Sequence, residues 1–159
     1  STGRSHLGSG GVATKIAAAR MAAWSGIPTV IAEARDERAV GLAVSGGDVG
    51  TWIQPHDSKL SARKLWIAFG LPPQGRVTVD GGAVDALVRH GRSLLPVGVT
   101  SVVGDFDAGE AVEVLDPDGA MIGKGLASLS AAELEEAAGQ HSSVAGGVGI
   151  HRDDLVVLW

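Results

Sequence analysis

The chain has 159 residues, of which 45% are hydrophobic, and its formal net charge is −5. This length suits one ordinary domain or two small ones. The sequence contains no cysteine, which excludes disulfides and thiolate metal sites and is compatible with a reducing cytoplasm, where we expect the protein. No apolar run is long enough to cross a bilayer and no signal peptide is visible, so we expect no membrane association.

The charge is unevenly distributed along the chain. Residues 1–70 contain eight basic and five acidic residues, a net charge of +3. Residues 71–159 contain five basic and thirteen acidic residues, a net charge of −8. Long-range repulsion by such an acidic region disfavours a polyanionic partner for the second half.

A glycine-rich segment, residues 8–15, leads into an alanine-rich helix that we predict over 16–25. The first N–H groups of a helix lack internal partners, and glycine lets the backbone approach a phosphate closely. Lys15 would add positive charge to such an anion site. A plain glycine turn with a surface lysine explains the pattern equally well, since neither a P-loop nor a dinucleotide-binding fingerprint is present.

The remainder of the first region indicates an α/β arrangement. We predict strands at 28–32 and 50–53 with a short helix over 34–42 between them, and this alternation favours parallel pairing. These few elements would form only the edge of a sheet, with one side uncovered.

A basic cluster, Lys59, Arg63 and Lys64, follows these elements. We favour a solvated helix face with Trp66 packed beneath it over a contact with nucleotide phosphates or another subunit. Two prolines then mark a linker at 71–75, which divides the chain into domains of residues 1–70 and 76–159.

The second region is mostly β-structure. Asp80 is placed to cap a helix over 82–89, and Ser130 and Glu133 form a capping box for a helix that ends by Gly139. Asp116 to Gly119 is a strong turn signal. With the strands predicted at 76–79, 99–103, 111–115, 120–127 and 155–159, these elements indicate a small β-barrel-like domain.

Several motifs follow one another along the chain. They are GGVATK at 10–15, SGIP at 25–28, VGTW at 49–52, RKLWI at 63–67, GRVTVDGGA at 75–83, RSLLPVGV at 92–99 and HRDDL at 151–155. Together, in this order and spacing, they resemble the glutamate 5-kinase family of the amino-acid kinase superfamily, although each is weak alone. The resemblance covers almost the whole chain and implies the C-terminal portion of such an enzyme, with its first half absent. The family usually has methionine where this sequence has Val12.

The resemblance implies transfer of the γ-phosphoryl group of ATP, with Mg²⁺, to the γ-carboxylate of L-glutamate, the first step of proline biosynthesis. It assigns ATP contact to Ser9, Gly10, Gly11, Val12, Ala13, Thr14 and Lys15, with Lys15 supplying charge for the phosphates. It assigns no catalytic residue and no protein ligand for the metal. We expect a homo-oligomer, and we expect this chain by itself to be inactive because the glutamate-binding half is absent.

The same resemblance identifies residues 76–159 as a PUA domain, a module that binds structured RNA in other proteins. Arg89, His90 and Arg92 are its only local basic cluster, so RNA is not the expected partner here. We interpret residues 151–154 as a polar turn and not as a metal or acid/base site. The alternative to the kinase hypothesis is a non-catalytic module that binds RNA or protein through this domain.

Overall fold

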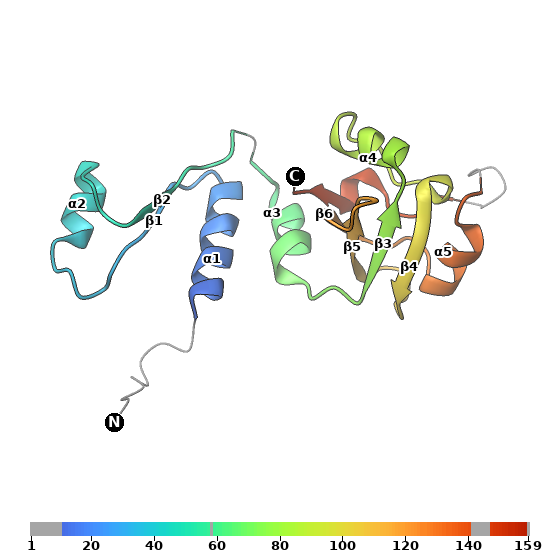
Figure 1. The fold of residues 1–159 in the computed structure, drawn as a ribbon, viewed down its shortest axis with the longest axis horizontal. Coiled ribbons are helices and arrows are strands. Elements are labelled where there is room, and N and C mark those ends of the chain that lie inside the picture. The colour runs from blue at the N-terminus through green and yellow to red at the C-terminus, as the bar shows by residue number, and fades with distance from the viewer. Residues whose placement is uncertain (1–10, 58, 141–146, 159) are drawn as a thin grey trace, which may run out of the picture. The chain divides into compact units, whose positions relative to one another are not determined.

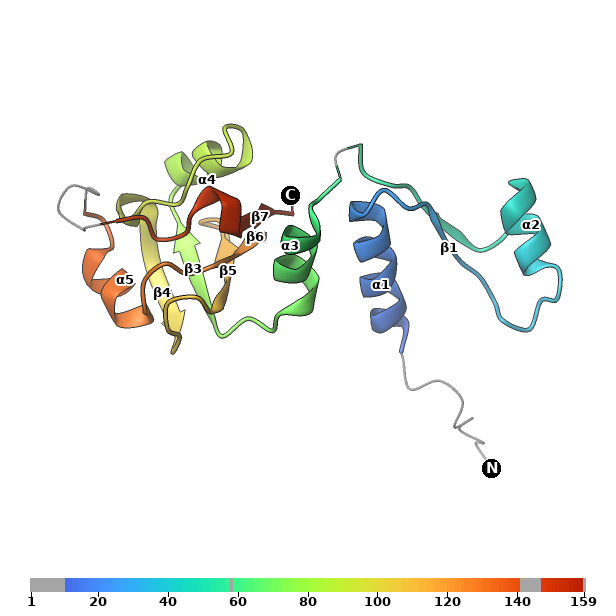
Figure 2. The same ribbon diagram turned by 180° about the vertical axis from the view of Figure 1, so that it is seen from behind.

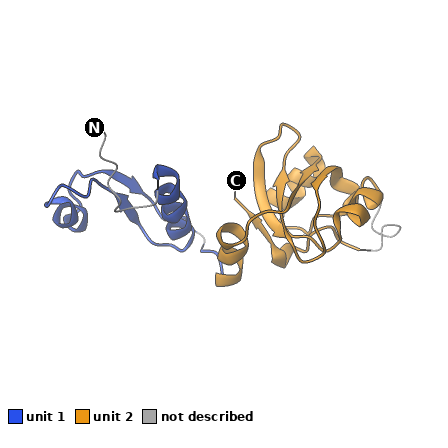
Figure 3. Ribbon diagram, turned by 90° about the horizontal axis from the view of Figure 1, so that it is seen from below, with its two compact units in different colours: residues 1–61 blue, residues 62–159 orange. Residues whose placement is uncertain are grey.

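The structure, a computed structural model, describes residues 11–57, 59–140 and 147–158. The chain forms two compact units, which we call unit 1 (residues 1–61) and unit 2 (residues 62–159) (Figure 3). Unit 2 begins nine residues before the predicted linker at 71–75, so residues 62–70 belong by their contacts to the second unit.

Unit 1 contains two helices and one pair of short strands (Figure 1). Its elements are α1 (Val12–Trp24), β1 (Thr29–Ile31), α2 (Ala39–Ser45) and β2 (Thr51–Ile53). β1 and β2 pair antiparallel, with Val30 opposite Trp52. The predicted parallel pairing is therefore wrong, because the segment between the strands turns back through α2 and does not cross over one face.

Two predicted helix starts in unit 1 differ from the structure. α1 begins at Val12, four residues earlier than predicted, so the second half of the glycine-rich segment is helical. α2 begins at Ala39 and not at residue 34, because Asp36 Oδ1 accepts a hydrogen bond from Arg38 N at 3.0 Å and holds residues 36–38 in a turn. After α1, the Trp24 and His56 rings stack with centroids 3.6 Å apart.

Unit 2 is built on a five-stranded sheet with strand order β4-β3-β5-β6-β7 (Figures 1 and 2). The pairs are antiparallel except for β3 and β5, which run parallel. The helices α4 and α5 flank the strands on different sides (Figures 1 and 2). The strands and these helices are β3 (Gly75–Val79), α4 (Gly81–Val88), β4 (Val99–Gly104), β5 (Ala111–Leu115), β6 (Met121–Leu126), α5 (Ala131–Ala137) and β7 (Leu155–Val157).

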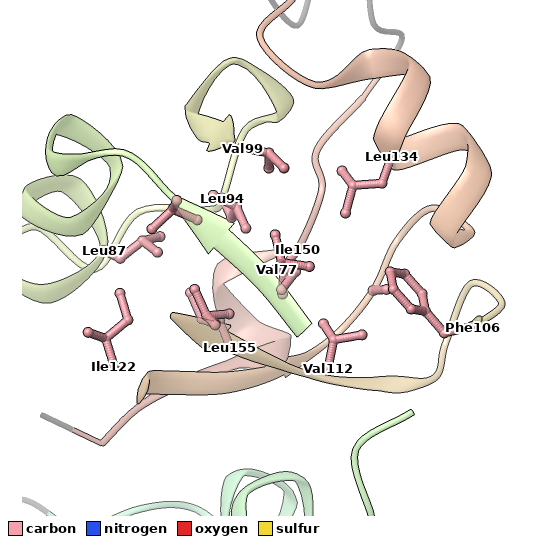
Figure 4. Close-up of a cluster of buried hydrophobic side chains, with 13 residues drawn as sticks. Val77, Leu87, Leu94, Val99, Phe106, Val112, Ile122, Leu134, Ile150 and Leu155 are labelled. Carbon is pink, nitrogen blue, oxygen red and sulfur yellow. The ribbon is translucent and has the colours of Figure 1, made fainter. Parts of the chain in front are cut away.

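One hydrophobic cluster forms the core of unit 2 (Figure 4). Val77 lies at its centre on β3, and Leu87 of α4 and Leu134 of α5 reach it from different sides (Figure 4). The alternating strand pattern explains this arrangement, because every second side chain of a strand faces the same side of the sheet. The structure confirms a small β-rich domain with a core of its own.

The local capping and turn signals of the second region are confirmed. Asp80 Oδ1 accepts a hydrogen bond from Ala83 N at 2.7 Å and begins α4. Ser130 and Glu133 form the predicted capping box of α5. Asp116 Oδ1 accepts from the backbone N–H groups of residues 118 and 120, and Gly119 closes the turn with a φ of 84°.

The start of unit 2 is fastened to its sheet by a buried lysine. α3 (Ala62–Leu65) continues into the π-helical turn η1 (Trp66–Gly70). Lys124 of β6 is only 6% exposed, and its Nζ donates to the backbone carbonyls of Ala68 and Leu71. Burial lowers the pKa of Lys124, with the Glu113 carboxylate acting in the opposite direction.

Candidate functional site

Gly11 and the first turn of α1 contain the described part of the predicted nucleotide segment. Ser9 and Gly10 lie outside the described residues. Gly11 is the N-cap of α1, with φ −68° and ψ 178°, and residues 12–15 form the first turn. All five positions are exposed.

The backbone N–H groups in the first turn of α1 are suited to bind an anion. Gly11 has no side chain to cap the helix, and its carbonyl accepts from Thr14 N at 3.1 Å and Lys15 N at 3.4 Å. The N–H groups of Val12 and Ala13 precede the first intrahelical bond, so helix geometry leaves them without an intrahelical acceptor. The first turn of α1 carries no acidic side chain that would compete for them. Backbone N–H groups without an intrahelical acceptor and the Lys15 ammonium thus stand at the positive end of one helix.

One member of the basic cluster before Trp66, Arg63, forms an ion pair within unit 2. Arg63 donates from Nε at 2.9 Å and from Nη2 at 2.5 Å to Asp154 Oδ1. Trp66 is 50% exposed, so the expectation that it packs beneath the cluster is wrong. Its neighbour Ile67 is fully buried instead, since η1 turns that side chain toward the sheet of unit 2.

The predicted polar turn at 151–154 is confirmed and lies beside a cavity. His151 caps the short 3₁₀ helix η3 (Arg152–Asp154), with its Nδ1 accepting from Asp153 N at 3.3 Å. His151 and Arg152 line a cavity of about 690 Å³ within unit 2. Sequence reasoning gave this turn no function, because the other wall of the cavity is more than fifty residues away in the chain.

The cavity lies between α4, the loop that follows α4, and the segment before β7. Its walls combine polar residues with several small apolar side chains. The lining residues are Asp80, Gly82, Ala83, Ala86, Leu87, Arg92, Ser93, Leu94, Leu95, Val97, Gly98, Val148, His151 and Arg152. Figures 1 and 2 show α4 beside the C-terminal segment that carries His151 and Arg152. The combination of a concave surface and a few polar groups is typical of ligand sites.

Backbone hydrogen bonds join the walls of this cavity. Leu94 and Ile150 form a β-bridge, and Leu94 N donates to the Ile150 carbonyl at 2.9 Å. Ser93 Oγ accepts from Arg152 N at 3.0 Å. On the other side, Asp80 N donates to the Gly98 carbonyl at 2.9 Å. These hydrogen bonds hold the three chain segments together.

The predicted basic cluster at 89–92 separates into two parts. Asp85 Oδ1 lies 3.2 Å from Arg89 Nε, and Asp85 Oδ2 lies 3.4 Å from His90 Nε2. Arg92 instead lines the cavity, and no described carboxylate pairs with it. Only one of the three side chains therefore offers its charge to the cavity.

Metal-binding clusters and membrane-spanning helices are absent from the described residues. Residues 11–57, 59–140 and 147–158 contain no group of three or more His, Cys, Asp or Glu side chains able to hold a metal ion. No helix within these ranges combines the length and apolarity needed to cross a bilayer.

Comparison with protein families identifies unit 2. The PUA domain family model matches residues 75–144, which include β3 to β6, α4 and α5. The second unit is therefore a PUA domain. A crystal structure of a PUA domain from Aeropyrum pernix K1 matches 56% of this chain and 46% of its own, with 28% identity and a TM-score of 0.41.

Curated relatives match nearly the whole chain. A protein named glutamate 5-kinase from Trichormus variabilis is 44% identical over 161 residues, which cover 96% of this chain and 44% of that protein. A protein with the same name from Frankia casuarinae is 44% identical over 165 residues, covering 99% of this chain and 44% of its own. The chain thus spans less than half the length of these relatives.

Proposed function

We propose that this chain is the C-terminal part of an enzyme that phosphorylates L-glutamate. The proposal rests on its similarity to proteins named glutamate 5-kinase and on its PUA domain. In the proposed reaction a γ-carboxylate oxygen attacks the γ-phosphorus of ATP and ADP leaves, as the first step of proline biosynthesis. The names of the relatives and their match along 96% or more of the chain support this function. We place the enzyme in the cytoplasm.

The first turn of α1 is the observation that carries the proposal within this chain. When bound, ATP with Mg²⁺ supplies the phosphoryl group. The backbone N–H groups after Gly11 that lack an intrahelical acceptor would hold phosphate oxygens, and Lys15 would neutralise part of their charge. Ser9 and Gly10 complete the proposed segment. Phosphoryl transfer depends mainly on positioning and on positive charge around the oxygens, which suits such a site.

The surface of unit 1 supports the view that further protein completes the enzyme. Seven large hydrophobic side chains among its described residues are exposed, whereas its buried hydrophobic residues are three alanines. The exposed seven are Val12, Ile16, Met21, Ile27, Val40, Val44 and Trp52. In the proposed kinase, the glutamate-binding half or a second copy in a homo-oligomer would cover them. We therefore expect no kinase activity from this chain alone.

A lysine substitution in the longer enzyme tests the assignment. Lys15→Ala removes the ammonium at the proposed phosphate site, and we expect kcat/KM for ATP to fall by about a hundredfold, the usual size for one charged donor. Steady-state kinetics with glutamate and MgATP measure this effect, and thermal unfolding checks that the variant folds. Because Lys15 is exposed, its unfolding temperature should be unchanged.

Lys59→Ala is the matched control, since Lys59 is an exposed lysine of the same unit outside the glycine-rich segment. Its kinetics should equal those of the wild type. If Lys15→Ala and Lys59→Ala were both as active as the wild type, the nucleotide assignment to residues 9–15 would be wrong.

A further inference from the structure

The cavity in unit 2 has no part in the proposed phosphoryl transfer. Its volume of about 690 Å³ lies within the range of pockets that enclose metabolite-sized ligands, roughly 300–1,000 Å³. All of its lining residues belong to unit 2. A function for this cavity is therefore independent of the kinase proposal.

One side of the cavity is apolar. Ala83 and Ala86 come from α4, and Leu95 and Val97 from the loop that follows it. Leu95 and Val97 are 37% and 36% exposed, and among the described Val, Leu and Ile side chains of unit 2 only Val103 is more exposed. A ligand with a hydrocarbon or aromatic body would cover them and gain the free energy of burying that area.

The polar groups of the cavity favour an anion. The charged residues that line the cavity are two arginines, Arg92 and Arg152, and one aspartate, Asp80. Asp80 Oδ1 is already engaged by Ala83 N at 2.7 Å. Asp153 lies 3.7 Å from Arg152 Nε, but Arg92 has no carboxylate partner among the described residues. A guanidinium binds carboxylate and phosphate groups through two parallel hydrogen bonds, so Arg92 is suited to such a head group.

The backbone around the cavity leaves little room to collapse. A Cβ atom added to Gly98 would lie 2.6 Å from Ala83 Cβ, so the loop and α4 are already in close contact there. The Leu94–Ile150 bridge and the Ser93–Arg152 hydrogen bond fix the opposite side. A preformed cavity loses little conformational entropy when a ligand enters.

We propose that this cavity binds a small organic anion, with a carboxylate or phosphate head group against Arg92 and an apolar body against Ala83, Ala86, Leu95 and Val97. The surroundings disfavour a polyanion such as RNA. Residues 71–159 carry a net charge of −8, and Asp85 pairs with both Arg89 and His90 beside the cavity. A ligand with a single anionic group is repelled far less by this net charge than a polyanion, and Arg92 attracts it locally.

The test is an NMR titration of the full 159-residue chain, labelled with ¹⁵N, with four probes. Phenylacetate and phenyl phosphate carry both an anionic head and an apolar body, phenylacetamide carries the body alone, and inorganic phosphate carries the head alone. We expect saturable shifts of the Gly82 and Gly98 amides with one or both anionic aryl probes. The dissociation constant should lie below about 1 mM. Phenylacetamide and inorganic phosphate should bind at least about tenfold more weakly.

Two arginine variants make the test specific. Arg92→Gln should weaken binding of the anionic aryl probe by about tenfold, the loss expected for one charged hydrogen-bonding group. Arg89→Gln is the matched control, because Arg89 lies three residues away, is exposed, pairs with Asp85 and does not line the cavity. It should bind like the wild type, and the spectrum of each variant shows whether the chain is folded.

Three results would overturn the proposal. The first is the absence of saturable shifts with both anionic aryl probes. The second is evidence that the anionic head group has no role. Either phenylacetamide binding as tightly as the anionic aryl probes, or a folded Arg92→Gln variant binding them as tightly as the wild type, would give that evidence. The third is binding of a structured RNA hairpin at the same amides at physiological salt without binding of the aryl anions. Relative affinities of phenylacetate and phenyl phosphate distinguish carboxylate from phosphate as the preferred head group.

Discussion

Units 1 and 2 bury hydrophobic side chains in opposite ways. In unit 2, branched and aromatic side chains from the sheet, its connecting loops and both flanking helices meet in one cluster, which Figure 4 shows. In unit 1, the buried hydrophobic residues among those described are three alanines, Ala19, Ala23 and Ala39. Its larger apolar side chains lie at the surface, with Val44 85% exposed.

The physical reason lies in the number of strands and in how far each unit closes on itself. A two-stranded sheet with short helices cannot enclose a Val or Ile side chain on all sides, whereas five strands with α4 and α5 can. Burial contributes about 25 cal/mol per Å² of apolar surface, so unit 2 gains this free energy within itself. Unit 1 gains less of it, because its larger apolar side chains stay exposed.

The largest expected effect contrasts one side chain from each unit. Leu134→Ala removes a fully buried side chain from the core of unit 2 and should lower the free energy of unfolding by about 2–5 kcal/mol. Val44→Ala in unit 1 should change it by less than about 0.5 kcal/mol. Urea unfolding of the 159-residue chain, followed by circular dichroism, measures both. A comparable loss for Val44→Ala would show that unit 1 has a core of its own.

The next effect concerns the buried lysine that anchors the beginning of unit 2. Lys124→Met removes the donor to the carbonyls of Ala68 and Leu71. Amides of η1 should then exchange with solvent at least about tenfold faster, since one hydrogen bond from a charged group contributes about 1.5–3 kcal/mol. Hydrogen exchange measured by NMR tests this, and amides of α1 in unit 1 serve as the internal reference. Equal exchange in both proteins would show that Lys124 does not hold η1.

The same lysine predicts a pH dependence with a defined sign. Burial lowers the pKa of Lys124 in the folded chain below its ordinary value of 10.5, so the unfolded chain binds more protons between these two values. The free energy of unfolding of the wild type should therefore rise with pH across this alkaline window, relative to Lys124→Met. Urea midpoints measured at several pH values up to 10.5 test it. A constant difference between the two proteins would contradict it.

A smaller effect compares two arginine–aspartate pairs. Arg63→Ala breaks the pair with Asp154, which joins α3 to the end of unit 2, and should cost about 0.2–1 kcal/mol because both partners are partly solvated. Arg38→Ala breaks a pair with Asp36 two residues away in unit 1, where Arg38 is 81% exposed, and should cost nothing measurable. Thermal unfolding compares the two. The interpretation would fail if Arg38→Ala were the more destabilising change.

The smallest effect appears only through its pH dependence. The Ser130 backbone N–H, followed by its hydroxyl, lowers the pKa of Glu133 below its ordinary value of 4.5. The charged carboxylate therefore stabilises the folded chain above pH 4.5, and this contribution disappears as the pH falls through the folded pKa. Glu133→Gln should be less stable than the wild type at neutral pH and equal to it in strong acid. Melting temperatures across this range test the sign.

The sequence by itself determined the features that depend on close neighbours in the chain. Asp80 and Ser130 cap helices because an oxygen two or three residues before free N–H groups can always reach them. Asp116 and Gly119 form a turn for the same local reason. Alternation of apolar residues predicted the strands of unit 2, and the ordered motifs indicated the PUA domain and the kinase relatives that the comparisons also give.

Only the tertiary structure decided which distant residues meet. β1 and β2 pair antiparallel although their spacing favoured a parallel pair, and η1 buries Ile67 in place of Trp66. Lys124 donates hydrogen bonds to carbonyls of a segment more than fifty residues earlier in the chain. Arg92 and Arg152 line one cavity because the Leu94–Ile150 bridge joins their loops. No local pattern encodes such contacts, since each depends on the packing of the whole unit around the residue.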